Sequence, residues 1–383
     1  MKIIFIIKSF AAKAGVERVT SDKINYLAEQ GHQITLITYE QGNHSLSFPL
    51  HQNIQHIDLN TRFFALKRYA LFQRIIKIKQ LQRTFSRELQ KVVQTVQPDI
   101  ICTTTYSLSL ASIILNIKTY AKKIIESHVS FESTLKENDF KDRLLLKGIA
   151  RLYDWYTLRR VKNFDTLIAL TKGDAKRWSQ YIKEIHVIPN PVTHYPVTIK
   201  EHNAPHHRII CAGRLNQQKG FDLLIESFAL IANQCPEWHI DIYGSGDEEE
   251  KLRKLISEKN LDKHIFIHPA SDHIFDEFQN SDFFVFSSRY EGWGLVLVEA
   301  MACGIPPVSF RCNYGPEEII TDNTDGLLVK NGDIKDLADK ILWMIHHPKE
   351  RLSMGLAARA SAKKFQKDAI MERWLQAMSS LIS

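Results

Sequence analysis

The chain has 383 residues, a formal net charge of +7 at pH 7, 44% hydrophobic residues and 24% charged residues. These proportions are those of an ordinary globular protein, and they exclude an intrinsically disordered chain and a fibrous repeat. The length exceeds what one hydrophobic core usually supports, so we expect two domains.

The apolar segment from Ile3 to Ile7 lies between two lysines. It is too short for a signal-peptide core or a membrane span, and we expect it to form a buried first strand. No later stretch reaches the roughly 18 to 20 apolar residues that cross a bilayer. The sequence therefore predicts a cytoplasmic protein, in which the five cysteines are reduced and structural.

Short apolar runs alternate with amphipathic helical runs along the whole chain, a pattern typical of parallel sheets with helices on both faces. The expected strands of the first half are Ile3–Ile7, Ile34–Thr38, Ile54–Leu59, Ile100–Thr103, Lys123–Ser127, Thr166–Leu170 and His186–Ile188. Those of the second half are Arg208–Ala212, His239–Tyr243, Ile265–Ile267, Phe283–Ser287, Pro307–Phe310 and Gly326–Val329. We expect two facing Rossmann-like, doubly wound α/β domains, with a ligand in the cleft at the carboxyl ends of both sheets.

A strongly basic helix is expected between Arg62 and Lys91. From Thr61 to Gln97 the chain has nine Lys and Arg residues against the single acid Glu88. The apolar residues fall on one helical stripe and should face the core, namely Leu71, Ile75, Ile78, Phe85, Leu89, Val92 and Val96. A separate face carries cations at a spacing of four residues, namely Lys79, Arg83, Arg87 and Lys91. This face is either solvated or binds an anionic membrane surface, and no nucleic acid is expected, because no binding module accompanies the charge.

A proline-rich polar segment from Pro189 to Pro205 separates the two halves, and its four prolines can continue neither a helix nor a sheet interior. Residues 1–190 carry 29 Lys and Arg against 16 Asp and Glu, and residues 191–383 carry 21 against 27. The halves should therefore meet different partners. We expect domains at 1–190 and 191–366, and a last helix at 367–383 that either completes the second domain or packs back on the first.

Three glycine-containing turns, Ala14–Arg18, Gly213–Gly220 and Gly244–Gly246, follow expected strands and precede expected helices. Backbone amides and a helix dipole favour anions at such turns. None is a Walker A loop or a complete dinucleotide fingerprint, which argues against a P-loop ATPase and an NAD enzyme. The middle turn carries Arg214 and Lys219, whose charges would neutralise a diphosphate, although surface ion pairing is the alternative.

Glu291 and Glu299 lie in the segment Ser287–Gly304, which joins an expected strand to an expected helix. Eight residues of helical rise would separate the two carboxylates by about 12 Å along the axis. That is too far for both to act on one bond as a hydrolase pair does. A carboxylate accepts two hydrogen bonds from a vicinal diol, so the two could instead hold opposite ends of a sugar nucleotide. The alternative for each is an exposed acid without a ligand.

With these motifs in place, the chain resembles glycosyltransferase family 4, the retaining GT-B enzymes. The elements Gly213–Gly220 and Glu291-x7-Glu299 match the family pattern at the expected places. The start around Gly15-Val-Glu-Arg and the Ile188-Pro-Asn-Pro hinge match more loosely. The resemblance covers essentially the whole chain and implies an amino-terminal acceptor-binding domain and a carboxy-terminal nucleotide-sugar-binding domain.

The resemblance also implies roles for individual residues. Arg214 and Lys219, in the turn that begins at Gly213, would bind the donor diphosphate. Glu299 would bind the ribose and Glu291 the sugar hydroxyls.

Further implied contacts come from the backbone and from the first domain. The amides of Gly294 and Leu295 would reach the donor phosphate or sugar, and Gly15 would approach the diphosphate from the other domain. His128 matches the cleft histidine of the family near the donor sugar, and the alternative is a core histidine with both nitrogens satisfied.

The mechanism that the family implies is retaining and metal-independent, with the departing phosphate deprotonating the acceptor. No Asp-x-Asp motif for Mg²⁺ stands on an expected strand-end loop, so we expect neither a metal nor another cofactor. The resemblance places catalysis on Glu291, His128, Arg214 and Lys219, in a hexosyltransferase that uses a nucleotide-diphosphate sugar. Cations and a helix N-terminus can stabilise the diphosphate charge without a metal.

The expected reaction transfers a hexose or an N-acetylhexosamine, from UDP in preference to GDP, to a lipid-linked or cell-surface glycan acceptor. This would place the enzyme in polysaccharide, capsule or lipopolysaccharide biosynthesis, as a peripheral protein on the inner face of the membrane. Two alternatives remain open at this point. One is a UDP-sugar 2-epimerase-like isomerase, and the other is a non-catalytic subunit that binds a nucleotide sugar.

Overall fold

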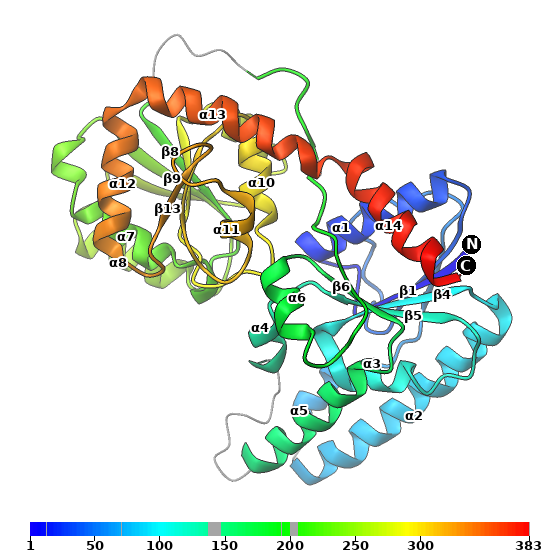
Figure 1. Ribbon diagram of the computed structural model, residues 1–383. Helices are drawn as coiled ribbons and strands as arrows, with labels where there is room; N and C mark the ends of the chain where they lie inside the picture. Colours follow the sequence, from blue (N-terminus) through cyan, green and yellow to red (C-terminus); the bar gives the residue numbers. More distant parts are fainter. Residues whose placement is uncertain (13, 70, 137–146, 193, 200–205, 383) are drawn as a thin grey trace. The chain divides into compact units, whose positions relative to one another are not determined.

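The structure is a computed structural model, and it describes residues 1–383 apart from 13, 70, 137–146, 193, 200–205 and 383. Residues 200–205 of the expected boundary segment thus lie outside the described residues. The chain divides into two compact units (Figure 1). The first comprises Met1–Pro189 together with Met371–Ser383, and the second comprises Asn190–Ile370. The carboxy-terminal residues therefore belong to the first unit.

The first unit is built on a seven-stranded sheet in the order β3-β2-β1-β4-β5-β6-β7, in which all pairs are parallel. Its strands are β1 (Lys2–Ile7), β2 (Gln33–Thr38), β3 (Gln55–Asp58), β4 (Ile100–Thr104), β5 (Lys122–Ser127), β6 (Thr166–Ala169) and β7 (Ile185–Val187). Its helices are α1 (Gly15–Glu29), α2 (Leu71–Val96), α3 (Leu108–Ile114), α4 (Phe131–Lys136), α5 (Lys147–Val161) and α6 (Lys172–Trp178), with most of α14 (Lys367–Ile382).

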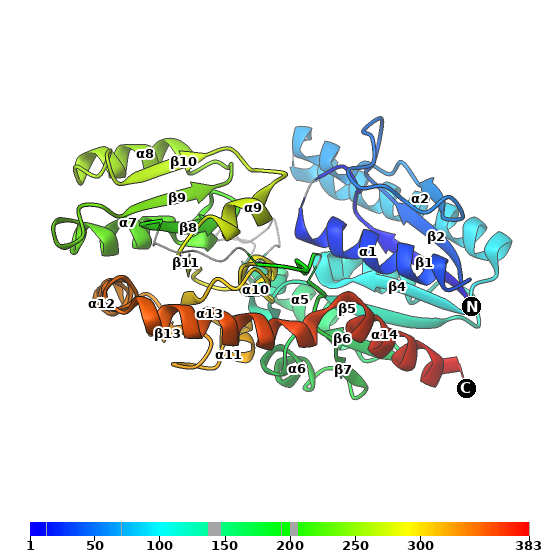
Figure 2. The ribbon, with the colours of Figure 1, turned by 90° about the horizontal axis from the view of Figure 1, so that it is seen from above.

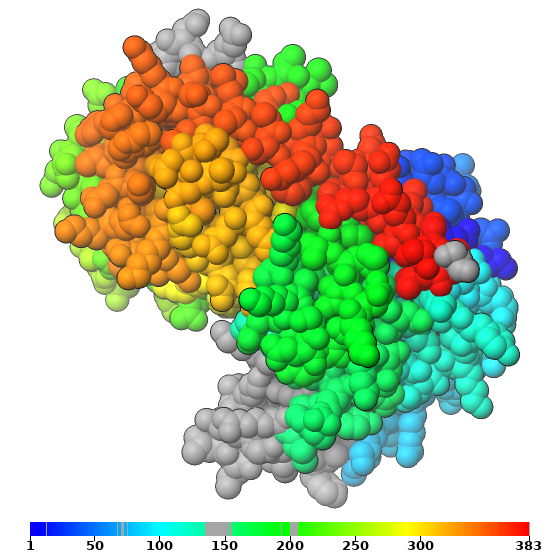
Figure 3. Space-filling view, viewed as in Figure 1, coloured from blue at the N-terminus to red at the C-terminus, as the bar shows by residue number. Residues whose placement is uncertain are grey.

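Helices cover both faces of this sheet. On one face α2 and α3 pack against strands β1, β2 and β4 through the buried residues Phe85, Leu89 and Leu110. On the other face α1 lies beside α14, and the side chains of α14 form part of the surface of the first unit (Figures 1 and 3). Because both faces are covered, strand β1 is apolar at every position from Ile3 to Ile7.

The second unit repeats this architecture with a six-stranded parallel sheet in the order β10-β9-β8-β11-β12-β13 (Figure 2). Its strands are β8 (Arg208–Ala212), β9 (His239–Tyr243), β10 (Ile265–His268), β11 (Phe283–Phe286), β12 (Pro307–Phe310) and β13 (Leu327–Val329). Its helices are α7 (Phe221–Ala229), α8 (Glu249–Glu258), α9 (Ile274–Gln279), α10 (Leu295–Ala302), α11 (Gly315–Ile319), α12 (Ile334–His346) and α13 (Pro348–Ala362).

The expected doubly wound α/β architecture is confirmed for each unit. All thirteen expected strands are present, and each end lies within one residue of its expected position. In both sheets the strand order reverses once, between β1 and β4 in the first unit and between β8 and β11 in the second. Such a reversal opens a crevice at the carboxyl ends of the two strands, where open α/β sheets bind ligands.

Candidate functional site

The reversal point of the second sheet lies between the two loops that the sequence singled out. The Gly213–Gly220 loop follows β8, and the loop that carries Glu291 follows β11, its neighbour in the sheet. Because parallel strands end at the same edge, both loops emerge side by side. The structure therefore brings the two motifs together within one unit.

The two loops are tied to each other by hydrogen bonds to backbone carbonyl oxygens. The Arg289 N–H donates to the Gln218 carbonyl oxygen at 2.8 Å, and the Ser287 hydroxyl donates to the Lys219 carbonyl oxygen at 3.0 Å. Gly220 adopts a φ of +63°, and a Cβ there would lie 2.1 Å from the Ser287 carbonyl oxygen. Glycine at this position is therefore required both by conformation and by the close approach of the second loop.

Lys219 and Glu291 form an ion pair across these loops. The Lys219 Nζ lies 2.7 Å from Glu291 Oε1, and the two side chains are 16% and 9% exposed. The ammonium also lies 5.1 Å from the centroid of the Phe286 ring. The Glu291 N–H donates to the Asn313 carbonyl oxygen at 2.8 Å, which fixes the loop on its other side. Sequence reasoning assigned the two residues to separate parts of a ligand and did not anticipate their contact.

Arg214 and Arg289 differ in their surroundings. Arg214 is exposed and forms no ion pair with any residue that the structure describes. Arg289 instead binds both carboxylate oxygens of Asp222, at 2.7 and 2.6 Å. Burial alone would raise the pKa of Asp222, but the Arg289 guanidinium lowers it by more. Arg289 thus anchors one loop to the start of α7, a role that sequence reasoning missed although the residue stands two positions before Glu291.

The third glycine turn has a packing explanation. A Cβ at Gly244 would lie 1.9 Å from the Gly213 carbonyl oxygen, and a Cβ at Gly246 would lie 2.2 Å from the Leu215 carbonyl oxygen. The Leu215 N–H donates to the Ser245 carbonyl oxygen at 2.9 Å. These glycines therefore let one turn support the Gly213–Gly220 loop, which accounts for them without a phosphate.

Glu299 lies in α10 and is 5% exposed, and Glu291 is 7% exposed. Neither is the solvated acid that was the alternative for each. Glu299 is also close enough to Cys303 for its charge to act on the thiol, whose pKa is raised to about 12, first by burial and then by this carboxylate. A buried carboxylate at this position must be satisfied by polar groups, whether of the protein or of a ligand.

The estimate of about 12 Å between the two carboxylates does not apply, because it assumed a helix over all eight residues. Helix α10 begins only at Leu295, and its N-cap is Gly294, with a φ of +103°. Only four residue steps are helical, which gives about 6 Å of rise. Since Gly294 has no side chain to cap the helix, the amides of its first turn are available to a ligand.

Gly15 and His128 belong to the first unit. Gly15 is the exposed first residue of α1, and no side chain caps that helix. His128 follows β5, with its side chain only 3% exposed and its Nε2 at 3.0 Å from Glu126 Oε2. Among the described residues, its Nδ1 is buried without a hydrogen-bond partner. The alternative of a core histidine with both nitrogens satisfied is therefore not what the structure contains.

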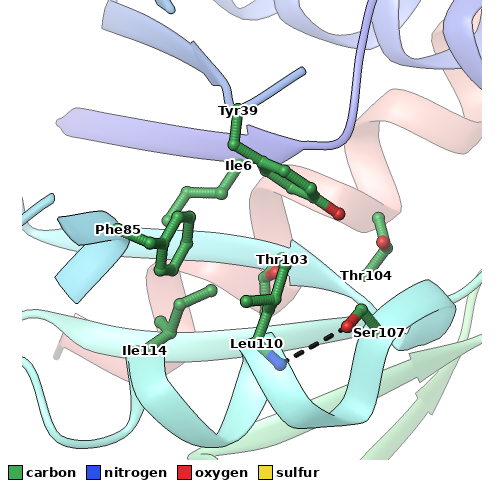
Figure 4. Close-up of a pocket in the computed structure, with 8 residues that line it drawn as sticks. All are labelled: Ile6, Tyr39, Phe85, Thr103, Thr104, Ser107, Leu110 and Ile114. Carbon is green, nitrogen blue, oxygen red and sulfur yellow. Dashed lines mark hydrogen bonds between the residues drawn. The ribbon is translucent and has the colours of Figure 1, made fainter. Parts of the chain in front are cut away.

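A small pocket lies at the reversal point of the first sheet (Figure 4). Its walls come from β1, β4, α2, α3 and the residue after β2, and they are Ile6, Tyr39, Phe85, Thr103, Thr104, Ser107, Leu110 and Ile114. Hydroxyl groups line one side and apolar side chains the other. Sequence reasoning missed this pocket, although the run of three threonines that begins within the last two residues of a buried strand was a visible signal.

Other expectations concern metals, cysteines and membranes. Within the described ranges, no group of three or more His, Cys, Asp or Glu side chains is placed to hold a metal ion. All five cysteines are buried and free. No helix in the described part of the chain has the length and apolar character needed to cross a bilayer.

The comparisons with known families cover nearly the whole chain. Residues 14–194 match the model of glycosyltransferase family 4, and residues 198–361 match that of glycosyl transferases group 1. An uncharacterized glycosyltransferase of Haemophilus influenzae is 25% identical over 97% of this chain and 98% of its own length. The amylovoran biosynthesis glycosyltransferase AmsD of Erwinia amylovora is 22% identical over 97% of this chain and 98% of its own length.

A third relative is more similar over a shorter region. The poly(ribitol-phosphate) alpha-N-acetylglucosaminyltransferase of Staphylococcus aureus is 34% identical over 48% of this chain, and the match covers 38% of that relative. The chain thus spans well under half the length of this relative.

Two solved structures show the same fold at low sequence identity. A TarM variant of S. aureus, in complex with fondaparinux, alpha-GlcNAc-glycerol and UDP, has a TM-score of 0.77 at 16% identity over 98% of this chain and 99% of its own. The pneumococcal O-GlcNAc transferase GtfA, in complex with UDP and GlcNAc, has a TM-score of 0.75 at 15% identity over 100% of this chain and 99% of its own. The fold is GT-B, and the chain belongs to family 4 of the group 1 glycosyltransferases.

Proposed function

We propose that this chain is a retaining, metal-independent glycosyltransferase that moves a hexose or an N-acetylhexosamine from a UDP-sugar to a lipid-linked or cell-surface glycan. The observation that carries the proposal is the Lys219–Glu291 pair beside the exposed Arg214, at the reversal point of the second sheet. These groups suit an anionic diphosphate joined to a polyhydroxylated sugar.

The ion pair is compatible with donor binding because an ammonium group has three N–H donors. Lys219 can give one of them to Glu291 and still donate to a phosphate oxygen. The planar guanidinium of Arg214 can bind a second phosphate oxygen through two parallel hydrogen bonds. Glu291 keeps a second carboxylate oxygen for a sugar hydroxyl, so one pair serves both the charged and the neutral part of the donor.

The proposed reaction breaks the bond between the anomeric carbon and the diphosphate oxygen. The acceptor oxygen bonds to the anomeric carbon on the same face, and the proton of the acceptor hydroxyl passes to the departing phosphate oxygen. Arg214, Lys219 and the amides at the start of α10 stabilise the charge that develops on the diphosphate. No protein nucleophile is required.

The choice of UDP and of a polymeric acceptor is supported by the similar proteins. Both solved structures were obtained with UDP. The names of the relatives refer to poly(ribitol-phosphate) and to amylovoran biosynthesis. A cell-surface polymer or its lipid-linked precursor is accordingly the acceptor class that we propose.

The test combines donor binding with transfer. The full chain is titrated with UDP, GDP and ADP sugars by calorimetry, and the donor that binds is then supplied in labelled form with lipid-linked and polymeric acceptors. We expect UDP-sugar binding and label in the acceptor. Conversion of the free sugar nucleotide to its epimer would favour an isomerase, and binding without turnover would favour a non-catalytic subunit.

We also propose that α2 and the preceding segment bring the enzyme to an anionic membrane surface. In the second half of α2 the apolar residues face the core, since Phe85, Leu89 and Val93 are buried and Val92 and Val96 pack against them. On the outer face the basic side chains at Lys79, Arg83, Arg87 and Lys91 are exposed. Phe64, Tyr69 and Ile76 are 51%, 42% and 47% exposed. The side chains of Lys67, Leu71, Phe72 and Ile75 lie outside the described set.

Each basic residue near an anionic surface contributes about 1 kcal/mol to binding, and salt weakens that contribution. We expect the protein to sediment with phosphatidylserine vesicles at low salt and not with phosphatidylcholine vesicles. Replacing Lys79 and Arg83 by Glu should abolish sedimentation, whereas replacing Lys254 and Lys259 of α8 and its end should not. Equal sedimentation with both vesicle types would disprove membrane attachment through charge.

A further inference from the structure

A row of three buried charged and polar side chains lies in the first unit, on α1 and at the carboxyl end of β5. Lys23 of α1 donates a hydrogen bond to Glu126 Oε2 of β5, and His128 Nε2 lies 3.0 Å from the same oxygen. The side chains of the three residues are 2%, 5% and 3% exposed. All three lie in the first unit, whereas the Lys219–Glu291 pair lies in the second.

The Lys23 ammonium is enclosed by aromatic rings. It lies 3.9 Å from the centroid of the Trp374 ring and 5.5 Å from that of Phe5. Trp374 is contributed by α14, at the far end of the chain, and it is itself 4% exposed. An ammonium that faces two rings and one carboxylate is stabilised as a cation without water.

The charges of this row determine which nitrogen of His128 carries hydrogen. Burial by itself would raise the pKa of Glu126, but the Lys23 ammonium and a hydrogen bond from the His128 ring hold it below its ordinary value. An ionised carboxylate only accepts hydrogen bonds, so Nε2 must be the protonated nitrogen. Lys23 already balances the carboxylate charge, and a second buried cation on the ring would be uncompensated. The neutral ring therefore presents a bare lone pair at Nδ1.

The backbone around His128 is fixed from a second direction. Asp174 of α6 accepts hydrogen bonds from the Ser127 hydroxyl and from the Phe131 N–H, both at 2.7 Å. These contacts hold the chain immediately before and three residues after His128. The ring is thus held at Nε2 and through its backbone, while the buried Nδ1 lacks a partner among the described residues.

We propose that Lys23 and Glu126 are positioning residues that hold His128 as the Nε2–H tautomer, so that Nδ1 accepts a hydrogen bond from a sugar hydroxyl. The group that contacts Nδ1 must donate a hydrogen bond. A hydroxyl can do so, whereas a phosphate or carbonyl oxygen cannot. The identification of that hydroxyl with the transferred sugar rests on the proposed function. The assignment of the Nε2–H tautomer does not depend on the proposed function.

The first experiment measures the tautomer directly. The full chain is labelled with ¹⁵N histidine, and the His128 signals are assigned from their loss in the His128→Gln variant. We expect Nε2 to be protonated and Nδ1 to be unprotonated in the wild type. A protonated Nδ1 in the neutral ring would overturn the proposal without reference to any variant or to activity.

Double variants then test the roles of Lys23 and Glu126. The variant K23M/E126L removes both charges and the acceptor, so the ring should populate both tautomers. The variant K23M/E126Q keeps an amide oxygen opposite Nε2 and should restore the wild-type tautomer. An unchanged tautomer in K23M/E126L would show that the pair does not position the ring. Replacing the exposed pair Lys254 and Glu258 provides the control.

The second experiment separates sugar recognition from nucleotide binding. Calorimetry with UDP and with the matching UDP-sugar should show that K23M/E126L loses about tenfold in affinity for the UDP-sugar and less than twofold for UDP. An equal loss for both ligands would indicate a merely structural role and overturn the positioning role. Failure of the wild type to bind any nucleotide sugar would refute the proposed function, while the tautomer measurement would still decide the first claim.

Discussion

The two units each contain a buried or half-buried lysine–glutamate pair, and the pairs differ in what surrounds them. Lys219 and Glu291 come from two adjacent loops, and their side chains are 16% and 9% exposed. Lys23 and Glu126 come from a helix and a strand, are 2% and 5% exposed, and contact two aromatic rings and a histidine. The first pair is partly open to solvent, whereas the second is almost entirely covered by protein. In our proposals, the same two residue types serve ligand binding in the second unit and positioning of a histidine in the first.

The largest expected effect concerns the enclosed pair. The variant Glu126→Leu leaves the Lys23 ammonium buried without its partner and should lower the free energy of unfolding by about 3–5 kcal/mol. The double variant K23M/E126L removes both charges and should recover most of that loss. Denaturant titration of both proteins checks this, and equal destabilisation of the two would contradict the unpaired-charge explanation.

Next in size is the loss of catalysis when the open pair is broken. In the proposed mechanism Lys219 faces the developing diphosphate charge, so Lys219→Ala should lower kcat by about 10²–10³-fold. Its matched control is Lys259→Ala, which breaks the exposed pair with Glu226 on the same unit. Transfer assays on both variants test this prediction. An unchanged kcat in Lys219→Ala would show that this residue takes no part in the mechanism.

The pH dependence of the free energy of unfolding should reveal the contributions of two carboxyl groups near His128, Asp174 and Glu126. Burial raises the pKa of Asp174 to about 6, from an ordinary value of 3.8, by more than its hydrogen bonds from Ser127, Phe131 and Trp178 lower it. The folded state therefore binds this proton more tightly than the unfolded state, and stability falls as the pH rises from about 4 to about 6. The shift corresponds to a loss on the order of 3 kcal/mol.

The variant Asp174→Asn should remove the fall in the free energy of unfolding between about pH 4 and about pH 6. The contribution of Glu126 has the opposite sign, since its lowered pKa makes it stabilising above pH 4.5 and lost as the pH falls toward 2. Unfolding measured by circular dichroism between pH 2 and 7 separates the two. An Asp174→Asn profile with the wild-type slope between pH 4 and 6 would argue against this assignment.

The smallest expected effect concerns the junction of the two loops. Gly220→Ala places a Cβ against the Ser287 carbonyl oxygen at a positive φ and should destabilise the protein by about 1–3 kcal/mol. It should also weaken UDP binding, because the loop that carries Lys219 must shift. Gly332 has a similar positive φ with nothing within 4 Å of its Cβ position, so Gly332→Ala tests strain alone. Thermal unfolding should show a larger loss of stability in Gly220→Ala than in Gly332→Ala. Calorimetry should show weaker UDP binding in Gly220→Ala alone.

The apolar runs predicted the strands well because strands covered on both faces must be apolar at nearly every position. The site loops were also predictable, since their glycines and charged residues directly follow such runs. The ion pairs could not be predicted from the sequence. Lys219 and Glu291 are 72 residues apart, and Lys23 and Glu126 are 103 residues apart. Contacts of that kind depend on which strands become neighbours. The distance between Glu291 and Glu299 was misjudged because the glycines between them delay the start of the helix.

The position of Trp374 constrains the order in which the two units can complete their folding during synthesis. The first unit begins with Met1 and is completed only by residues from Met371 onward, after the whole second unit. During synthesis on the ribosome, the Lys23 ammonium therefore lacks the Trp374 ring until α14 has emerged. A chain that stops before Met371 would carry a first unit without this aromatic contact.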